Sequence, residues 1–292
     1  MTLVVGYTPH KGDRTPIQLG AMLARSGGQK LRLVTVVPAP WPTPVAGGTD
    51  REFVDWAEDY AAKAVIEAQA AAAELCPDLT VEAVSVPGSS VAGALISEAE
   101  KFDAAMIVVG SGSHGSWGTV VVSSTSDRLL HSAHVPVAVA TRGFRASADA
   151  TVKRVTCAFR GDEPSRAVLA RTASICRDIG ASLRVATFGV QGRTIYPSGV
   201  LGEAEILDAY VKHTAAEQDK AVAALGDAPP GSVETAVATG RSWSEALEGL
   251  PWDKGDVLVV GSSSASFMSR LFLGSTASKI VRRSPVPVVV VP

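Results

Sequence analysis

The residues with the clearest chemical potential lie near the end of the chain, from Gly261 to Thr276. The apolar run 256–260 before them is typical of a buried parallel strand, and 279–284 after them of a short helix. Gly274-Ser275-Thr276 opens that helix, where backbone N–H groups without partners and the positive end of the helix dipole favour an anion. The spacing therefore predicts a phosphate-binding site between the end of this strand and the start of this helix.

Hydroxyl and guanidinium groups surround this site and add donors to the backbone groups. The candidate ligand residues are Gly261, Ser262, Ser263, Ser264, Arg270, Gly274, Ser275 and Thr276. Arg270 is the favoured cation, because a guanidinium pairs well with phosphate. Lys279, Arg282 and Arg283 are better interpreted as solvated residues at the helix end, which favours cations in any case. Serines in a glycine-containing loop are also typical of ordinary turns, and that alternative stays open.

Length, charge and hydropathy limit the classes of protein to which the chain can belong. The 292 residues exceed the usual size of one domain, so two domains are expected. A formal charge of −2 argues against a nucleic-acid partner held by phosphate neutralisation. No run of about 18 apolar residues and no cationic leader with a cleavage site occurs, so we expect a cytoplasmic protein without a membrane partner.

Cysteines and histidines form no pattern that predicts chemistry. The three cysteines, Cys76, Cys157 and Cys176, form no Cys-x-x-Cys motif. We interpret them as small core residues. His131 and His134 are three residues apart, but no neighbouring carboxylate in the sequence completes a metal site. Gly-x-Ser-x-Gly, P-loop lysine and His-Glu-x-x-His motifs do not occur. We therefore expect no catalytic residue and no metal, and a protein that binds rather than an enzyme.

An internal repeat sets the expected architecture. Val108-Val-Gly-Ser111 recurs as Val259-Val-Gly-Ser262, and Val135-Pro-Val137 recurs as Val286-Pro-Val288, both 151 positions later. Self-similarity at one fixed offset predicts a tandem duplication. The expected domains are 1–145 and 150–292.

Each copy is predicted to alternate strands with helices. In the first copy we expect strands at 3–7, 31–37, 80–86, 105–110 and 135–140, and helices at 16–27, 50–75, 90–101 and 125–132. In the second copy we expect strands at 152–159, 182–188, 256–260 and 285–292. One helix is expected to begin at Pro164, a long helix to end near Leu225, and a third helix to follow Ser242. Thr15 before Pro16 is predicted to cap a helix, and Ser242 with Glu245 to form a capping box.

This alternation predicts an α/β fold, with a parallel sheet covered by helices on both faces. A ligand is then expected beyond the carboxyl ends of the strands, where the strand order reverses. The last strand is interpreted as a sheet edge whose valine row pairs with another copy of the chain.

The sequence Gly261-x2-Ser264-x9-Gly274-Ser275 resembles the Gly-x2-Gly-x9-Gly-Ser/Thr nucleotide loop of the universal stress protein family. Val-Val-Gly-Ser at the start of this loop and Ser-Pro-Val-Pro-Val-Val-Val-Val after its helix are similar to that family too. The resemblance covers essentially the whole chain twice, which is the tandem form.

The resemblance implies one open five-stranded sheet of order 3-2-1-4-5 in each domain, of the adenine nucleotide alpha-hydrolase-like type. It also implies a homodimer through the final edge strands, a role in stress response with a protein partner and, in many members, ATP binding. In those members the first and third motif glycines and the following hydroxyls wrap the ribose and phosphates. An Asp after strand one and backbone near strand two hold the adenosine.

The two copies depart from this pattern to different degrees. The second copy replaces the middle glycine with Ser264, whereas the first copy retains one glycine of the three. The weaker candidates of the first copy are Gly110, Ser111, Ser123, Ser124 and Thr125. Thr8 and Arg160 stand where the Asp after strand one is expected, and Arg160 becomes a candidate phosphate partner.

Three functions remain open from the sequence. The first is a stress-response regulator that binds ATP in its second domain and associates with partners. The second is a dimeric scaffold that binds no nucleotide, which the missing Asp and the substituted glycines favour. The third is a slow ATPase, for which the sequence offers no evident general base.

Overall fold

The computed structural model describes residues 1–9, 13–39, 49–190, 203–226, 233–262 and 273–292, and the described residues form ten strands and eight helices. The first half contains β1 (Thr2–Gly6), α1 (Thr15–Gly27), β2 (Lys30–Pro38), α2 (Thr49–Leu75), β3 (Val81–Gly88), α3 (Val91–Lys101), β4 (Met106–Val109), α4 (Ser124–Ser132) and β5 (Val137–Val139). The second half contains β6 (Arg154–Ala158), α5 (Glu163–Ile179), β7 (Ser182–Val190), α6 (Glu203–Ala223), β8 (Glu234–Gly240), α7 (Trp243–Glu248), β9 (Asp256–Gly261), α8 (Ser275–Arg283) and β10 (Val288–Val291). Both halves thus follow the predicted alternation.

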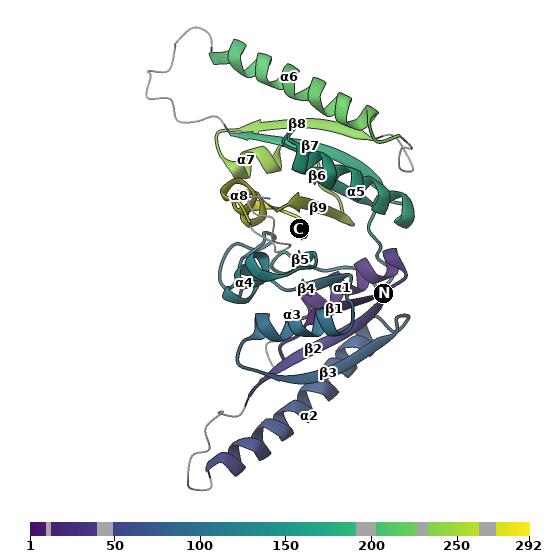
Figure 1. Cartoon of the computed structure of the whole chain (residues 1–292), viewed down its shortest axis with the longest axis vertical. Coiled ribbons are helices and arrows are strands. Elements are labelled where there is room, and N and C mark those ends of the chain that lie inside the picture. Colours follow the sequence, from purple (N-terminus) through teal and green to yellow (C-terminus); the bar gives the residue numbers. More distant parts are fainter. Residues whose placement is uncertain (10–12, 40–48, 191–202, 227–232, 263–272) are drawn as a thin grey trace.

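The ten strands form one sheet in the order β3-β2-β1-β4-β5-β10-β9-β6-β7-β8 (Figure 1). Within each half every pairing is parallel. Numbered within its own half, each set of five strands has the order 3-2-1-4-5, so the predicted fold class is confirmed.

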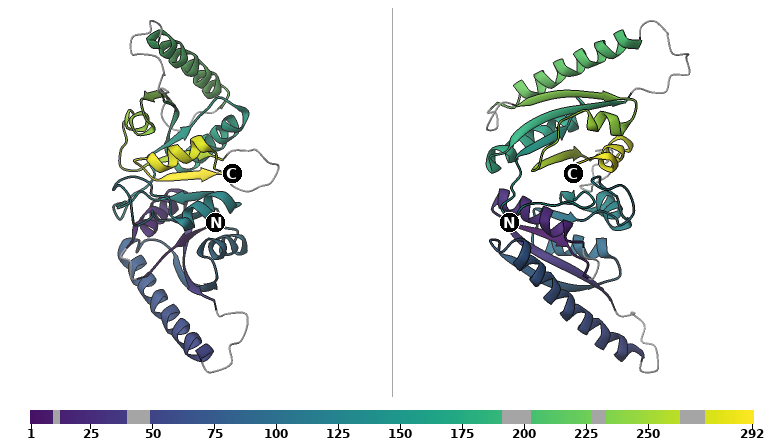
Figure 2. Two further views of the ribbon diagram at one scale, coloured as in Figure 1. Left: turned by 90° about the vertical axis from the view of Figure 1, so that its left-hand side faces the viewer. Right: turned by 180° about the vertical axis from the view of Figure 1, so that it is seen from behind.

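The last strand is not a sheet edge, and this prediction is wrong. β10 pairs antiparallel with β5 of the same chain, with Val288 opposite Val139 and Val290 opposite Val137. In Figure 2 the yellow β10 lies against the first half. The strand edge at which a homodimer was expected to form is therefore occupied within the chain. The covalent link raises the effective concentration of β5 far above that of a second copy, and β3 and β8 become the outer strands.

Each face of the sheet carries one layer of helices and one apolar core. Side chains alternate along β1, so Leu3 and Val5 pack with α1 on one face while Val4 packs on the other. The first core contains Leu169 of α5, and the second contains Ile280 of α8. Both cores draw residues from both halves, so the apolar interior continues across the β5–β10 pairing.

Helix ends differ in detail from the predictions. Thr15 is the first residue of α1 rather than its cap, and its N–H donates to Asp13 Oδ1 at 3.0 Å. Ser242 Oγ accepts from Glu245 N as predicted, but the Glu245 carboxylate accepts from the N–H of Arg241 instead of closing the box on Ser242.

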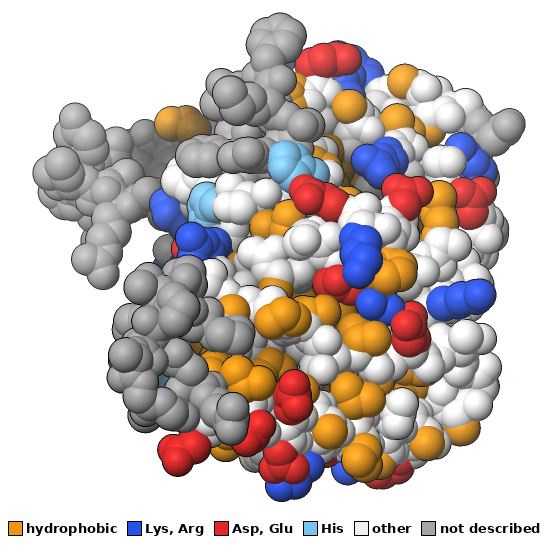
Figure 3. All heavy atoms as spheres, turned by 60° about the horizontal axis from the view of Figure 1, so that its bottom comes forward, with side chains coloured by type: hydrophobic (Ala, Val, Ile, Leu, Met, Phe, Trp, Pro, Cys, Tyr) orange, Lys and Arg blue, Asp and Glu red, His pale blue; other side chains and the backbone are white. Residues whose placement is uncertain are grey.

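The distribution of surface charge and the hydropathy of the helices test whether the protein has a nucleic-acid or a membrane partner. On the face drawn in Figure 3, Lys and Arg side chains lie among Asp and Glu side chains and do not gather into one basic patch. In the part of the chain that the structure describes, no helix combines the length and the hydropathy needed to cross a bilayer.

Candidate functional site

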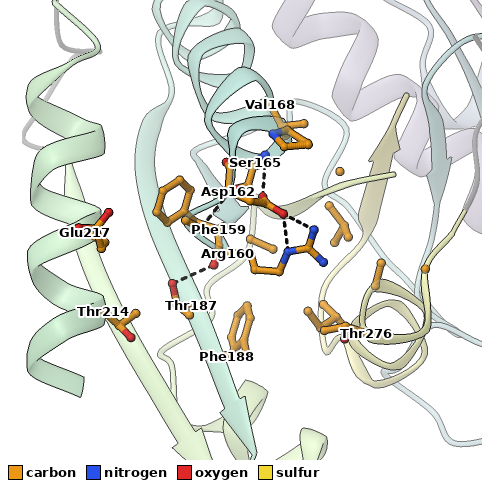
Figure 4. Close-up of a pocket in the computed structure, with 18 of the residues that line it drawn as sticks. Phe159, Arg160, Asp162, Ser165, Val168, Thr187, Phe188, Thr214, Glu217 and Thr276 are labelled. Atoms are coloured by element: carbon orange, nitrogen blue, oxygen red, sulfur yellow. Dashed lines mark hydrogen bonds and ion pairs between the residues drawn. The ribbon is translucent and has the colours of Figure 1, made fainter. Parts of the chain in front are cut away.

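The second half encloses a cavity of about 600 Å³ at the carboxyl ends of β6, β7 and β9. Residues of α5, α6 and α8 supply its other walls (Figure 4). The cavity lies between β6 and β9, which is the point where the strand order of this half reverses. Its volume is typical of small-molecule sites, and its place is the one predicted for a ligand crevice.

The start of α8 forms one end of this cavity. Gly274 precedes the first helical residue and provides no side-chain cap. Ser275 and Thr276 are exposed and line the cavity. The first turn of α8 contains no acidic residue that would repel an anion. The helix start therefore offers backbone N–H groups and two hydroxyls to a ligand.

Gly261 lies at the end of β9 and has a packing reason to be glycine. A Cβ atom there would lie 2.9 Å from Cγ2 of Val168 on α5, closer than carbon atoms approach. The next residue, Ser262, donates its backbone N–H to the carbonyl of Val291 at 2.8 Å. Both residues line the cavity.

Three of the predicted ligand residues, Ser263, Ser264 and Arg270, lie outside the described residues. Their roles stay predictions.

Arg160 lies in the cavity wall after β6, and its charge is already paired. Its Nε donates to Asp162 Oδ2 at 2.7 Å, and its Nη2 contacts the same oxygen. Asp162 Oδ1 in turn accepts from the N–H of Ser165 and caps α5. Partial burial alone would raise the pKa of Asp162, but the hydrogen bonds from Arg160 and Ser165 outweigh it and lower that pKa. A phosphate at Arg160 would therefore compete with Asp162.

The strand side of the cavity is apolar and tightly held. Phe159 and Phe188 are buried and line it. Thr187 Oγ1 donates to the Phe159 carbonyl at 2.9 Å and accepts from Gln218 Nε2 at 2.9 Å. These bonds connect the ends of β6 and β7 to α6 and fix this wall.

A group of cavity residues on α6 was missed by the sequence analysis. Tyr210, His213, Thr214 and Glu217 all line the cavity. Their positions follow the spacing i, i+3, i+4, i+7, which places them on one side of a helix. A search of the long predicted helix for a polar stripe at this spacing would have found them.

The first half has a matching cavity of about 590 Å³ between β1 and β4. The residues predicted as ligands in this half make contacts within the protein itself. A Cβ atom at Gly110 would lie 2.7 Å from Asp13 Oδ2, so a carboxylate already occupies that space. Ser111 Oγ donates to the Ala140 carbonyl at 2.6 Å and accepts from Val121 N at 3.0 Å.

The start of α4 is capped by its own side chains, unlike the start of α8. Ser123 Oγ accepts from Ser126 N at 3.2 Å, and Ser126 Oγ accepts from Ser123 N at 2.7 Å. Asp127 adds a carboxylate to the first turn. Ser124 and Thr125 line the first cavity, next to this closed cap. The cap therefore uses two N–H groups at this helix start and places a carboxylate beside it.

The loop before α4 is fixed by contacts within the first half and one to the second. The Arg142 guanidinium lies 4.6 Å from the centre of the Trp117 ring, and Arg142 N donates to the Thr119 carbonyl at 2.8 Å. Val120 N donates to the carbonyl of Ser284, the residue after α8.

The histidines and cysteines are the side chains that could take part in metal or redox chemistry. Within the described ranges, no group of three or more His, Cys, Asp or Glu is placed to hold a metal ion. The two helix-end histidines do have carboxylates nearby, contrary to the sequence analysis. His131 Nδ1 lies 4.0 Å from Asp127 Oδ2, and His134 Nε2 lies 4.0 Å from Glu100 Oε1. All three cysteines are free and buried, as predicted: Cys76, Cys157 and Cys176.

Comparison with known proteins agrees with this architecture. The family model described as "Universal stress protein family" matches residues 1–141 and again 151–292. A universal stress protein of Mycobacterium tuberculosis is 35% identical over 294 residues, which cover 100% of both chains. A universal stress protein of Mycobacterium bovis matches equally well.

Solved structures share the fold at low sequence identity. A universal stress protein from Archaeoglobus fulgidus superposes with a TM-score of 0.57 at 17% identity, over 99% of this chain and 97% of that one. A putative universal stress protein from Pseudomonas aeruginosa gives a TM-score of 0.60 at 13% identity, over 99% and 92%. With two family matches and a relative aligned from end to end, the chain belongs to the universal stress protein family.

Proposed function

We propose that this chain is a stress-response regulator that binds an adenine nucleotide, ATP, in the cavity of its second half and acts by association with a protein partner. The observation that carries the proposal is the start of α8, which has no side-chain cap and opens into a cavity of about 600 Å³. Family membership supplies the nucleotide as the expected ligand.

In this proposal the phosphates lie at the start of α8. The N–H groups and hydroxyls of Ser275 and Thr276 donate to them, and the helix dipole adds a favourable field. The nucleoside extends toward β6 and β7, where Phe159 and Phe188 provide apolar surface. Gly261 and Ser262 form the floor between these two ends.

The first half is a poorer candidate for the same ligand. The cap formed by Ser123 and Ser126 uses the N–H groups of these two residues at the helix start, and Asp127 adds negative charge. Asp13 occupies the space beside Gly110. We therefore propose one nucleotide for each chain.

Binding rather than turnover is proposed as the mode of action. The phosphate end of the cavity is built from backbone and hydroxyl donors, which hold a phosphate chain without supplying a base to activate water. Phosphate release on incubation with ATP would favour a slow ATPase instead.

The alternative function is a scaffold that works without nucleotide. The β5–β10 pairing fixes the two halves together with no ligand. The pairing of Arg160 with Asp162 removes a cation that a phosphate would otherwise use. Both observations favour this alternative.

A search for bound nucleotide separates the two functions. Freshly purified protein is denatured, and the supernatant is analysed by absorbance at 260 nm and by mass spectrometry. Nucleotide binding predicts a released adenine nucleotide, or its uptake by the stripped protein in calorimetry. A supernatant without nucleotide, together with no heat on titration with ATP, leaves the scaffold.

A further inference from the structure

The cavity of the second half has two chemically different ends. The described part of the α8 end presents backbone N–H groups and the hydroxyls of Ser275 and Thr276, and the first turn of α8 has no carboxylate. The opposite end is the polar stripe of α6, where Glu217 and Thr214 supply acceptors. Figure 4 shows Glu217 and Thr214 on α6, across the cavity from Thr276, with Arg160 between them. A ligand that spans this cavity meets backbone N–H donors at one end and a carboxylate acceptor at the other.

Glu217 is held in place as an ionised acceptor. Lys220 Nζ donates to its Oε1 at 2.8 Å, and Arg166 Nη2 of α5 donates to its Oε2 at 3.0 Å. The hydrogen bond from Lys220, followed by the bond from Arg166, lowers the pKa of Glu217. A carboxylate offers about four lone-pair positions, so these two bonds leave acceptor capacity for a ligand.

The other carboxylate that lines the described part of the cavity is Asp162, which accepts three hydrogen bonds where Glu217 accepts two. One oxygen of Asp162 accepts two bonds from Arg160, and the other accepts from Ser165 and caps α5. Arg160 itself stands where an acceptor for the nucleoside was expected from the sequence. Glu217 is therefore the cavity carboxylate best placed to accept hydrogen bonds from ligand hydroxyls.

We propose that Glu217 accepts a hydrogen bond from the ribose hydroxyls of the ligand, so that the cavity selects ribonucleotides over deoxyribonucleotides. This inference rests on the proposed function. A vicinal diol is a strong donor pair for a carboxylate, and loss of the 2′-hydroxyl leaves one acceptor without its partner. Thr214 lies one turn before Glu217 on the same side of α6 and also lines this wall of the cavity.

Calorimetric titration with ATP and with 2′-deoxy-ATP tests this inference on the full chain. The wild-type protein is expected to bind ATP about tenfold more tightly than 2′-deoxy-ATP, the value for one charge-assisted hydrogen bond. Glu217→Gln keeps the side-chain size, removes the charge and leaves a neutral amide oxygen as acceptor, so it is expected to lower the ratio of the two affinities toward one. Glu205→Gln is the matched control, because Glu205 is exposed on the same helix and does not line the cavity.

A second variant separates ligand contact from helix bridging. Arg166→Gln breaks the same α5–α6 ion pair but leaves the Glu217 carboxylate in place, so the preference for ATP should remain. Equal binding of both nucleotides by the wild type, or loss of the preference in Arg166→Gln as in Glu217→Gln, overturns the inference while nucleotide binding stands. Absence of binding of either nucleotide to the wild type rejects the proposed function itself.

Discussion

Single residues at the strand ends serve packing first, and this changes how the loop motif is interpreted. Gly261 faces Val168 on α5, and Gly110 faces Asp13 and Thr15. In both halves the first motif glycine permits close approach of a helix to the end of the fourth strand of its sheet. Retention of this glycine in both halves therefore carries no information about ligand binding.

The substitution Gly261→Ala tests this packing role. The added Cβ atom would meet Val168 Cγ2 at 2.9 Å, so we expect a loss of about 1–3 kcal/mol in the free energy of unfolding. Val168→Ala removes the opposing methyl groups, and the double variant should lose less than the sum of the two single losses. Urea denaturation measures all three proteins. Strictly additive losses would show that the two positions do not clash.

Residue identity alone indicated a different role for Arg160 than the structure does. A lone arginine near the expected nucleoside site suggested a phosphate partner, but Asp162 follows two positions later and pairs with it. Short-range ion pairs of this kind depend on the turn between strand and helix, and that turn was not predictable from composition. The contrast between Ser123 and Gly274 was visible in the sequence, yet its meaning required the cap geometry.

Elements were predicted well where local pattern determines them. Apolar runs predicted nine of the ten described strands, whereas β8, which begins with Glu234 and is partly exposed, was not assigned; high helix propensity without a breaker predicted α2. The duplication supported the same order in both halves. The pairing of β5 with β10 was missed because an apolar strand bracketed by prolines is equally compatible with pairing inside the chain or between chains. The polar stripe of α6 was missed because propensity gives no information about what a helix face contacts.

Hydrogen exchange tests the β5–β10 pairing. Pairing within one chain predicts that the amides of β5 and β10 exchange as slowly as those of the central strand β1, and that their protection is independent of protein concentration. The outer strands β3 and β8 should exchange faster. Protection of β10 that rises with concentration would instead indicate strand pairing between copies.

The whole molecule combines two similar folds with unequal cavities. Both cavities have nearly the same volume, about 590 and 600 Å³, so size does not distinguish them. The difference lies in the helix starts: α4 has a capping box that uses the N–H groups of Ser123 and Ser126, and it carries Asp127, whereas α8 has neither a side-chain cap nor an acidic residue in its first turn. Duplication thus provides a comparison within one chain, in which the helix start of the first half has a side-chain cap and that of the second half has none.

Calorimetric titration of the nucleotide-free chain with ATP tests this asymmetry most directly. The account predicts about one site for each chain. The double variant Gly274→Ser/Ala277→Ser copies the cap of α4 onto α8 and should weaken binding at least about tenfold, since it competes for N–H groups that otherwise meet a charged ligand. Its thermal unfolding should occur no lower than in the wild type, because a capped helix start is stabilising. Two equivalent sites for each chain, or unchanged affinity in the folded double variant, would contradict the account.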